Sequence, residues 1–278
     1  MKNRRSIDSS CWKCCTVLLT IFGLSVIVGC ESKPRLADDI NSAVTVASPS
    51  SNQERKSRFQ SKSPTLDDAD LRVLFVGNSH TQWHELPGLV ADLIEFRRPN
   101  TQTATESIGV AFLDQVETMP HVHDRLNEVR WDHVVLQAQK ISASGRFEHS
   151  TTEGIELAKL AIESGAKVHF FAEWGIQGDA NNANHTDGIY RKMAEESQAK
   201  LIPVTLVWSR ALVRSPGLSL YHKDGNHQSR LGASLTALAI ATHILDESPE
   251  LFSEYKDPVA TESQWAVFCE AVLHTRKP

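Results

Sequence analysis

The sequence predicts a doubly wound α/β/α sandwich of three layers, built around a mostly parallel sheet of about five strands. Two observations support this fold class. Over the 208 residues from Leu71 to the C-terminus, short β-branched runs alternate with segments of helical apolar spacing, which is typical of βαβ units. Most of these runs are apolar throughout, as expected for strands that are buried on both faces of a sheet.

The strands are predicted, in chain order, at the runs LRVLFV (71–76), TATESI (103–108), DHVVLQ (132–137), KVHFFA (167–172) and AKLIPV (199–204). The second run is the weakest because polar residues interrupt it. In an open parallel sheet, ligands bind outside the carboxyl ends of the strands. The residues that follow each run are therefore the candidates for a site.

Helices are predicted where apolar residues recur at intervals of three and four. One such stripe runs from Leu86 to Ile94, and a second runs from Ile155 to Ala161. The last helix is expected to begin after Ser229, a good N-cap residue, and to end near Leu245.

The N-terminus is typical of an exported protein. Four bases precede an uncharged apolar stretch, residues 16–29, which at 14 residues is short for a membrane span and suits a signal peptide. The stretch ends in Ile27-Val28-Gly29-Cys30, which resembles the bacterial lipoprotein box and implies lipidation of Cys30. An uncleaved anchor helix is the alternative. We expect residues 1–29 to be a lipoprotein signal peptide, and the chain to be anchored to a membrane through Cys30, on the periplasmic or extracellular side of a bacterial cell envelope.

Residues 30–70 are polar and rich in serine, which predicts a disordered tether, and residues 71–278 form the predicted globular domain. Only Cys269 lies within that domain, so no intramolecular disulfide is expected there.

Loss of the four bases and one acid in residues 1–29 takes the net charge from −5 to −8. A surface of this charge argues against nucleic acid as a partner.

The first candidate site residue is the serine of VGNSHT (76–81), where the first strand gives way to a helix. Ser79 on that turn projects at the carboxyl edge of the sheet, and its backbone N–H lies near a helix N-terminus, where negative charge is favoured. Serine and asparagine are also good N-cap residues, so helix entry alone accounts for this stretch as well.

A second cluster, YHKDGNHQSRLG (221–232), stands just before the last predicted helix. A serine hydroxyl becomes a good nucleophile when an imidazole takes its proton and a carboxylate fixes the tautomer of that imidazole. Asp224 and His227 can supply both groups from one loop, and Gly225 eases the turn. In a doubly wound sheet this loop opens at the same edge as Ser79. The two clusters together predict a Ser-His-Asp triad.

From Leu71 to about Leu245 the chain resembles the SGNH, or GDSL, hydrolase superfamily. VGNSHT is similar to its first block, and DGNHQSRLGASL is similar to its last, the Asp-x-x-His block. The resemblance covers about two thirds of the chain and implies a flavodoxin-like α/β/α fold and a serine esterase. In that reading Ser79 is the nucleophile, His227 the general base and then acid, and Asp224 the orienting carboxylate.

The resemblance also implies an oxyanion hole that includes the backbone N–H groups of Ser79 and Gly109. The third block departs from the family pattern, because Gln137-Ala138-Gln139 stands where Gly-x-Asn-Asp is usual. The side-chain amides of Gln137 and Gln139 are both candidate donors. The first block departs too, with Asn78 in place of the usual Asp, and Asn78 is expected to brace the turn.

His80 and His84 lie four residues apart and could face one way as metal ligands, but Thr81 stands where a zincin helix carries its glutamate. No metal and no organic cofactor are therefore expected. Asn78, His80 and Trp174 are candidate substrate-lining residues, with rim packing as the alternative for Trp174. The polar run GIQGDANNANH (175–185) is expected to be a long loop at the same edge.

These observations predict a serine hydrolase that cleaves carboxylic esters. O-acetyl groups on envelope or extracellular glycans are the first expected substrate, because of the envelope location, the polar loop and a tryptophan at the rim. Lipid or aryl esters are the second. A function of another class stays open, namely a non-catalytic glycan-binding module on the same fold, with turnover lost through the altered third block.

Overall fold

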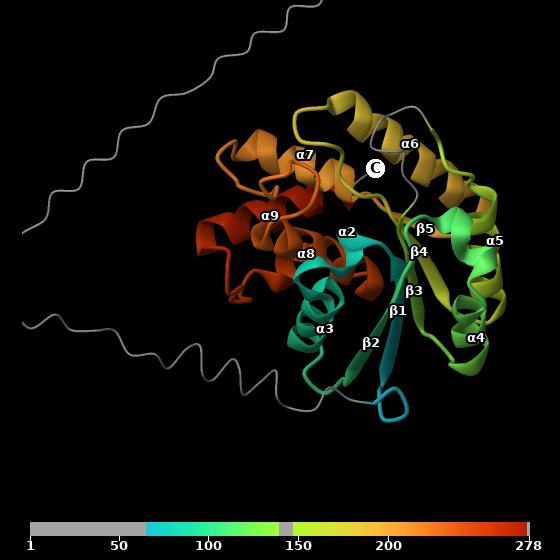
Figure 1. Cartoon of the computed structure of the whole chain (residues 1–278). Helices are drawn as coiled ribbons and strands as arrows, with labels where there is room; N and C mark the ends of the chain where they lie inside the picture. Colours follow the sequence, from blue (N-terminus) through green and yellow to red (C-terminus); the bar gives the residue numbers. More distant parts are fainter. Residues whose placement is uncertain (1–64, 139–146, 277–278) are drawn as a thin grey trace, which may run out of the picture. The chain divides into compact units, whose positions relative to one another are not determined.

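The computed structural model describes residues 65–138 and 147–276, which are built around a five-stranded sheet (Figure 1). The strands are β1 (Leu71–Gly77), β2 (Thr103–Gly109), β3 (His133–Leu136), β4 (Lys167–Phe171) and β5 (Lys200–Ile202). Every neighbouring pair is parallel, in the order β2-β1-β3-β4-β5. The predicted fold class and its five strands are confirmed, with β3, β4 and β5 one to three residues shorter than the predicted runs.

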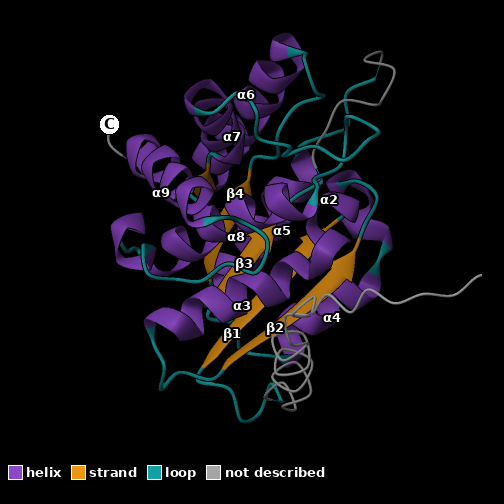
Figure 2. Cartoon of the chain, turned by 90° about the vertical axis from the view of Figure 1, so that its left-hand side faces the viewer, coloured by secondary structure: helices purple, strands orange, loops and turns teal. Residues whose placement is uncertain are grey.

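Helices cover both faces of the sheet (Figures 1 and 2). Successive residues of a strand point to opposite faces, and Val73 and Phe75 accordingly pack in one core cluster while Leu74 and Val76 pack in the other. The first face carries α3 (Leu86–Arg97), α7 (Val204–Arg214), α8 (Arg230–Leu245) and α9 (Glu262–Arg276). The second face carries α4 (Pro120–Glu128), α5 (Thr152–Glu163) and α6 (Ala180–Ser197). This double cover explains why most of the strand runs are largely apolar.

The long helix α8 is buried on almost all sides. Ser229 caps it, as predicted, by accepting a hydrogen bond from the backbone N–H of Gly232 at 3.1 Å. The prediction that this helix is the last one is wrong, because α9 follows it. The buried residues of α9 include Trp265, Phe268 and Val272, and their spacing of three and four is the ordinary signal of an amphipathic helix.

The chain passes from β1 to α3 through two short turns, α2 (Ser79–Gln82) and η1 (Trp83–Glu85). His84 and Glu85 both have left-handed backbone angles, with φ of 59° and 56°. Such angles cost energy in residues other than glycine and persist where the surroundings hold them. Two further 3-10 turns are η2 (Leu113–Thr118) and η3 (Pro249–Phe252).

The strand order reverses between β1 and β3, because β1 leads through α3 to β2 on one side while β3 leads to β4 on the other. Open α/β sheets bind ligands at such a switch point, outside the carboxyl ends of the strands. Ser79 and Gln137 follow those two strand ends. Within residues 65–138 and 147–276, no helix has both the length and the apolar character needed to cross a bilayer.

Candidate active site

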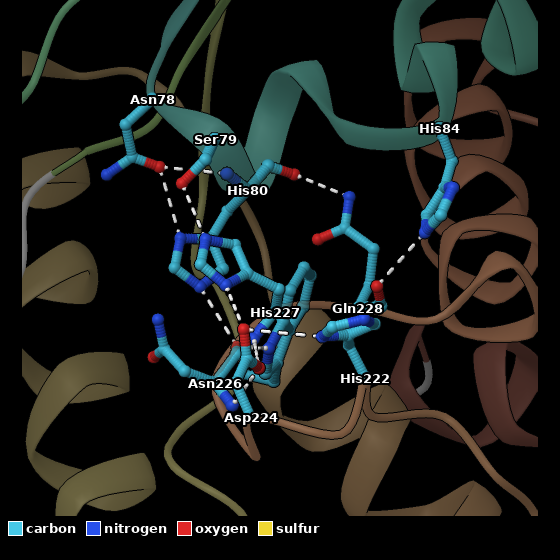
Figure 3. A network of polar contacts seen from close by, with 10 residues as sticks. Asn78, Ser79, His80, His84, His222, Asp224, Asn226, His227 and Gln228 are labelled. Carbon is cyan, nitrogen blue, oxygen red and sulfur yellow. Dashed lines mark hydrogen bonds and ion pairs between the residues drawn. The ribbon is translucent and has the colours of Figure 1, made fainter.

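Ser79 is the first residue of α2, close behind the end of β1. Asn78 is the N-cap of that turn, and its Oδ1 accepts a hydrogen bond from the backbone N–H of His80 at 3.0 Å. The Oγ of Ser79 lies 2.8 Å from Nε2 of His227, 148 positions later in the chain (Figure 3). The fold therefore brings the predicted nucleophile within hydrogen-bond distance of the predicted base.

Asp224 orients the imidazole of His227. Nδ1 of His227 lies 2.7 Å from Oδ2 of Asp224. Because a carboxylate only accepts hydrogen bonds, Nδ1 carries the proton and Nε2 is left to accept the hydroxyl hydrogen of Ser79. The other oxygen, Oδ1, accepts the backbone N–H groups of His227 and Asn226, both at 2.9 Å. These bonds hold the pKa of the Asp224 carboxyl well below its usual range, so the group stays ionised.

The loop that carries Asp224 and His227 is a tight turn, called the triad turn below (residues 221–228). It closes with an antiparallel bridge between Tyr221 and Gln228, and the backbone N–H of His222 donates to the carbonyl oxygen of His227 at 2.8 Å. Gly225 has φ of +67°, in the left-handed region that favours glycine. The turn therefore uses the glycine that the sequence placed between the carboxylate and the imidazole.

The imidazole of His80 packs beside the triad. It is 3% exposed, and its ring lies nearly parallel to that of His227, with centroids 5.1 Å apart and an angle of 15°. Its Nδ1 is 3.1 Å from Oδ1 of Asn78, and its Nε2 is 3.1 Å from the carbonyl oxygen of Asn226. This burial corrects the expectation that His80 lines the substrate site. The ring instead joins the turn that carries Ser79 (α2, called the nucleophile turn below) to the triad turn.

Trp174 has a similar supporting place. It is 1% exposed, stacks on Trp208 with centroids 4.2 Å apart, and donates from Nε1 to the carbonyl oxygen of Asn226 at 2.8 Å. The rim-packing alternative therefore describes Trp174, and the expectation that it lines the substrate site is corrected.

Gln228, the residue after His227, makes a second connection between the two turns. Its side chain is fully buried, and Nε2 donates to the carbonyl oxygens of His80 at 3.0 Å and of Trp83 at 3.2 Å. The carbonyl oxygen of Gln228 lies 3.2 Å from Nε2 of His84. Burial lowers the pKa of His84 from its ordinary value, which favours the neutral imidazole.

His80 and His84 are thus not arranged as a metal pair. Each imidazole faces a backbone carbonyl oxygen, one just before His227 and one just after it. In the part of the chain that the structure describes, no three His, Cys, Asp or Glu side chains gather in a way that would hold a metal ion.

Trp83 is a site residue that sequence reasoning did not find. Its indole stacks on the imidazole of His227, with centroids 4.0 Å apart and an angle of 14°. The available signal was its spacing of four residues from Ser79, because positions i and i+4 share one face of a helical turn.

Asn78 braces the turn, as expected, and ties three strand ends together. Its backbone N–H donates to Oε1 of Gln137 at 3.1 Å, and its Nδ2 donates to the carbonyl oxygen of Ala111, after β2, at 3.3 Å. Oε1 of Gln137 also accepts the hydroxyl of Thr81 at 2.7 Å. A side chain at Gly77 would collide with this arrangement, because a Cβ there would overlap Oγ1 of Thr81.

Gln137 does not have the geometry of an oxyanion donor. It is fully buried, and its Nε2 donates to the carboxylate of Glu173. Glu173 also accepts the hydroxyl of Tyr190 at 3.3 Å. This corrects the expectation for Gln137, whose amide serves a buried network behind the nucleophile turn. Gln139 and Cys30 lie outside the described residues and stay predictions.

Gly109 ends β2 and is exposed, and it pairs in register with Gly77 at the end of β1. A Cβ on Gly109 would lie 2.6 Å from Nε2 of Gln82, so the side chain of Gln82 occupies the space that a larger residue would need. The position of Gly109 beside the nucleophile turn is compatible with its predicted role, which stays a prediction.

The polar run 175–185 forms a shorter loop than expected. Asp179 caps α6 by accepting the backbone N–H of Asn182 at 2.9 Å, so the second half of the run is helical. In the remaining loop, the backbone N–H of Gln177 donates to the carbonyl oxygen of Gly225 at 2.8 Å. The loop therefore packs against the triad turn.

The sequence matches no protein-family model and no curated protein. Among solved structures, a DUF4886 family protein from Bacteroides uniformis is 14% identical with a TM-score of 0.52, over 74% of this chain and 94% of its own. A candidate GDSL-like lipase from Parabacteroides merdae is 15% identical with a TM-score of 0.51, over 63% and 97% of the two chains. A candidate SGNH hydrolase from Slackia heliotrinireducens is 26% identical with a TM-score of 0.44, over 62% and 97%. The first two likenesses show that this chain shares the α/β/α fold of the DUF4886 protein and the GDSL-like lipase.

Proposed function

We propose that this chain is a serine hydrolase that cleaves carboxylic esters. One observation carries the proposal, the chain of two contacts from Ser79 Oγ to His227 Nε2 at 2.8 Å and from His227 Nδ1 to Asp224 Oδ2 at 2.7 Å. Hydroxyl, imidazole and carboxylate follow one another in the order that proton transfer requires.

In the first step, Oγ of Ser79 attacks the carbonyl carbon of the ester while its proton passes to Nε2 of His227. The ionised Asp224 stabilises the imidazolium through the bond to Nδ1. The bond to the alcohol oxygen then breaks as Nε2 returns the proton to that oxygen, which leaves an acyl group on Ser79. Water, deprotonated by the same nitrogen, releases the acid and restores the hydroxyl.

The tetrahedral intermediate carries a negative oxygen that needs hydrogen-bond donors. Ser79 occupies the first position of α2, where a backbone N–H has no partner within the helix. We assign the second donor to the backbone N–H of Gly109. We assign the third to the side chain of Gln139, because the amide of Gln137 already donates to the carboxylate of Glu173. Loss of one such donor typically costs about 2.7–4 kcal/mol of transition-state stabilisation.

For the substrate, we propose O-acetyl groups on envelope or extracellular glycans. The predicted tether supports this choice, because it would hold the site close to envelope polysaccharides. The buried Trp174 offers no sugar platform, so lipid and aryl esters are tested beside the glycans.

The test uses the purified chain with p-nitrophenyl esters of acetate and longer acids, with an O-acetylated polysaccharide, and with a fluorophosphonate probe for active serines. We expect hydrolysis and labelling that are lost in Ser79→Ala and unchanged by a chelator. Binding of the polysaccharide without labelling or hydrolysis would instead assign the chain to glycan-binding modules.

We also propose that the chain is lipid-anchored in a bacterial envelope through Cys30. Expression in a bacterium with a labelled fatty acid should label the wild type and not Cys30→Ser. A Cys30→Ser chain that stays on the membrane would favour an uncleaved anchor helix.

A further inference from the structure

We infer that Trp83 is a positioning residue for the general base: its indole face holds the imidazole of His227 in line with Ser79 and stabilises the imidazolium that forms during ester cleavage. The inference rests on the proposed function and adds to it a residue outside the triad.

The stacking supplies a contact that the triad itself lacks. The two polar contacts of His227 are made in the plane of its ring, at Nε2 and Nδ1, and leave the ring faces uncovered. Trp83 covers one face, with centroids 4.0 Å apart and the rings within 14° of parallel. The side chain of His227 is 20% exposed, and both Trp83 and His80 stack on its ring, so these two neighbours restrain its rotation.

The chemistry of the indole suits a base that becomes charged. The face of an aromatic ring carries partial negative charge, and tryptophan attracts a cation more strongly than the other aromatic residues do. The attraction is greater for the imidazolium of His227 than for its neutral form. It therefore acts most when Ser79 has lost its proton, which is the condition for lowering the barrier of the step.

Trp83 is itself held in place by the residue that follows the base. Nε2 of Gln228 donates to the carbonyl oxygen of Trp83 at 3.2 Å. The left-handed angles of His84 and Glu85 end the short turn directly after the indole. Strained angles of this kind in two successive residues other than glycine cluster at functional sites.

Other titratable groups also face the two rings. His222 meets the indole edge-on at 5.2 Å, and its Nδ1 lies 3.4 Å from Oδ2 of Asp224. His80 stacks on His227, and His84 meets the indole at 6.1 Å. Because Asp224 is shared between two imidazoles, the indole face adds stabilisation of His227 that does not depend on this carboxylate.

Two variants separate the effect of an aromatic face on His227 from the effect of apolar packing alone. Trp83→Phe keeps a smaller aromatic face, and Trp83→Leu keeps apolar cover without one. We expect kcat for an aryl ester to fall about 3-fold in the Phe variant and about 10- to 30-fold in the Leu variant, with KM nearly unchanged. The acid limb of the kcat/KM profile should move to lower pH in the order Trp, Phe, Leu. Phe96→Leu, a change at a 38% exposed aromatic residue on α3, is the control and should leave both readouts unchanged.

A second readout does not need activity. NMR of the chain with labelled histidines follows the proton uptake of His227, and its midpoint should fall in the same order of variants. If the wild type hydrolyses no ester and the midpoint still falls in the variants, the proposed function fails. The result would still support the claim that Trp83 stabilises the imidazolium of His227. An unchanged midpoint, or a rise in KM alone, would overturn the inference. If the Leu variant does not fold, the comparison of Trp with Phe decides.

Discussion

Nε2 of Gln228 lies 3.0 Å from the carbonyl oxygen of His80, which precedes it by 148 positions. This contact runs beside the bond between Ser79 and His227 and joins the same two turns. An active site needs its reacting groups held within fractions of an ångström. A buried amide between the nucleophile turn and the triad turn supplies that constraint.

Gln228→Leu removes the donor from two carbonyl oxygens while keeping the volume of the side chain. Each oxygen left without a partner should lower the free energy of unfolding by about 1–3 kcal/mol. We also expect a fall in kcat, because the distance between Ser79 and His227 is no longer fixed. Urea unfolding and ester kinetics check both. Gln115→Leu, at an exposed glutamine of η2, is the matched control. Equal stability of the two variants would contradict the role of the Gln228 amide in joining the two turns.

Ser79→Ala and His227→Ala should each lower kcat by roughly 10³- to 10⁶-fold, and the double variant should be no worse than either one, since the triad acts as a unit. Asp224→Asn should be less severe. Steady-state kinetics of the three single variants and the double variant provide the measurement. Losses that add in the double variant would show that Ser79 and His227 act independently.

Asn78→Asp restores the residue that is usual in the resembling family, and we expect it to impair this chain. The Nδ2 donor to the carbonyl oxygen of Ala111 would become an oxygen that faces an oxygen, while the cap on the N–H of His80 is kept. Because the hydrogen bond to Ala111 is exposed, the free energy of unfolding should fall by about 0.5–1.5 kcal/mol. Asn78→Ser, which keeps a cap and introduces no charge, is the comparison; a stability of Asn78→Asp equal to wild type would refute the donor role.

Buried histidines predict acid sensitivity, His133, His169 and His243 among them. Burial lowers the pKa of His133 to about 4, and it lowers the pKa of His169 well below its ordinary value. Unfolded histidine takes up its proton near pH 6.5. Between about pH 6.5 and 4 the unfolded chain therefore binds protons that the native chain does not, so the free energy of unfolding falls as the pH falls through this window and is level above it.

His133 alone accounts for a loss of about 3 kcal/mol across that window. Urea unfolding at several pH values from 7.5 downward gives the slope. His133→Leu should make the dependence shallower without abolishing it, because His169 keeps its own contribution, and the exposed His121→Asn should leave it as it is. The contribution of Asp224 does not overlap, because a carboxyl with a lowered pKa loses its stabilising effect only below its unfolded value, near pH 4.

The sequence by itself determined the α/β alternation, the places of the five strands and the choice of Ser79, Asp224 and His227 as residues that the fold brings within hydrogen-bond distance. These features are local, since a strand buried on both faces needs an apolar run, and a nucleophile or a base needs a particular residue type in the turn that carries it. The spacing of Trp265, Phe268 and Val272 also predicts the helix α9, which the sequence analysis missed.

Only the tertiary structure decided the roles of the supporting residues. His80 and Gln228 carry no local mark of their partners, and Trp83 carries only its spacing from Ser79, because their contacts join segments about 145 positions apart. Gln137 likewise reads as a candidate donor until the buried carboxylate of Glu173 is seen to accept its amide. A side chain's residue type states which bonds it can form, and the packing of distant segments selects the one it makes.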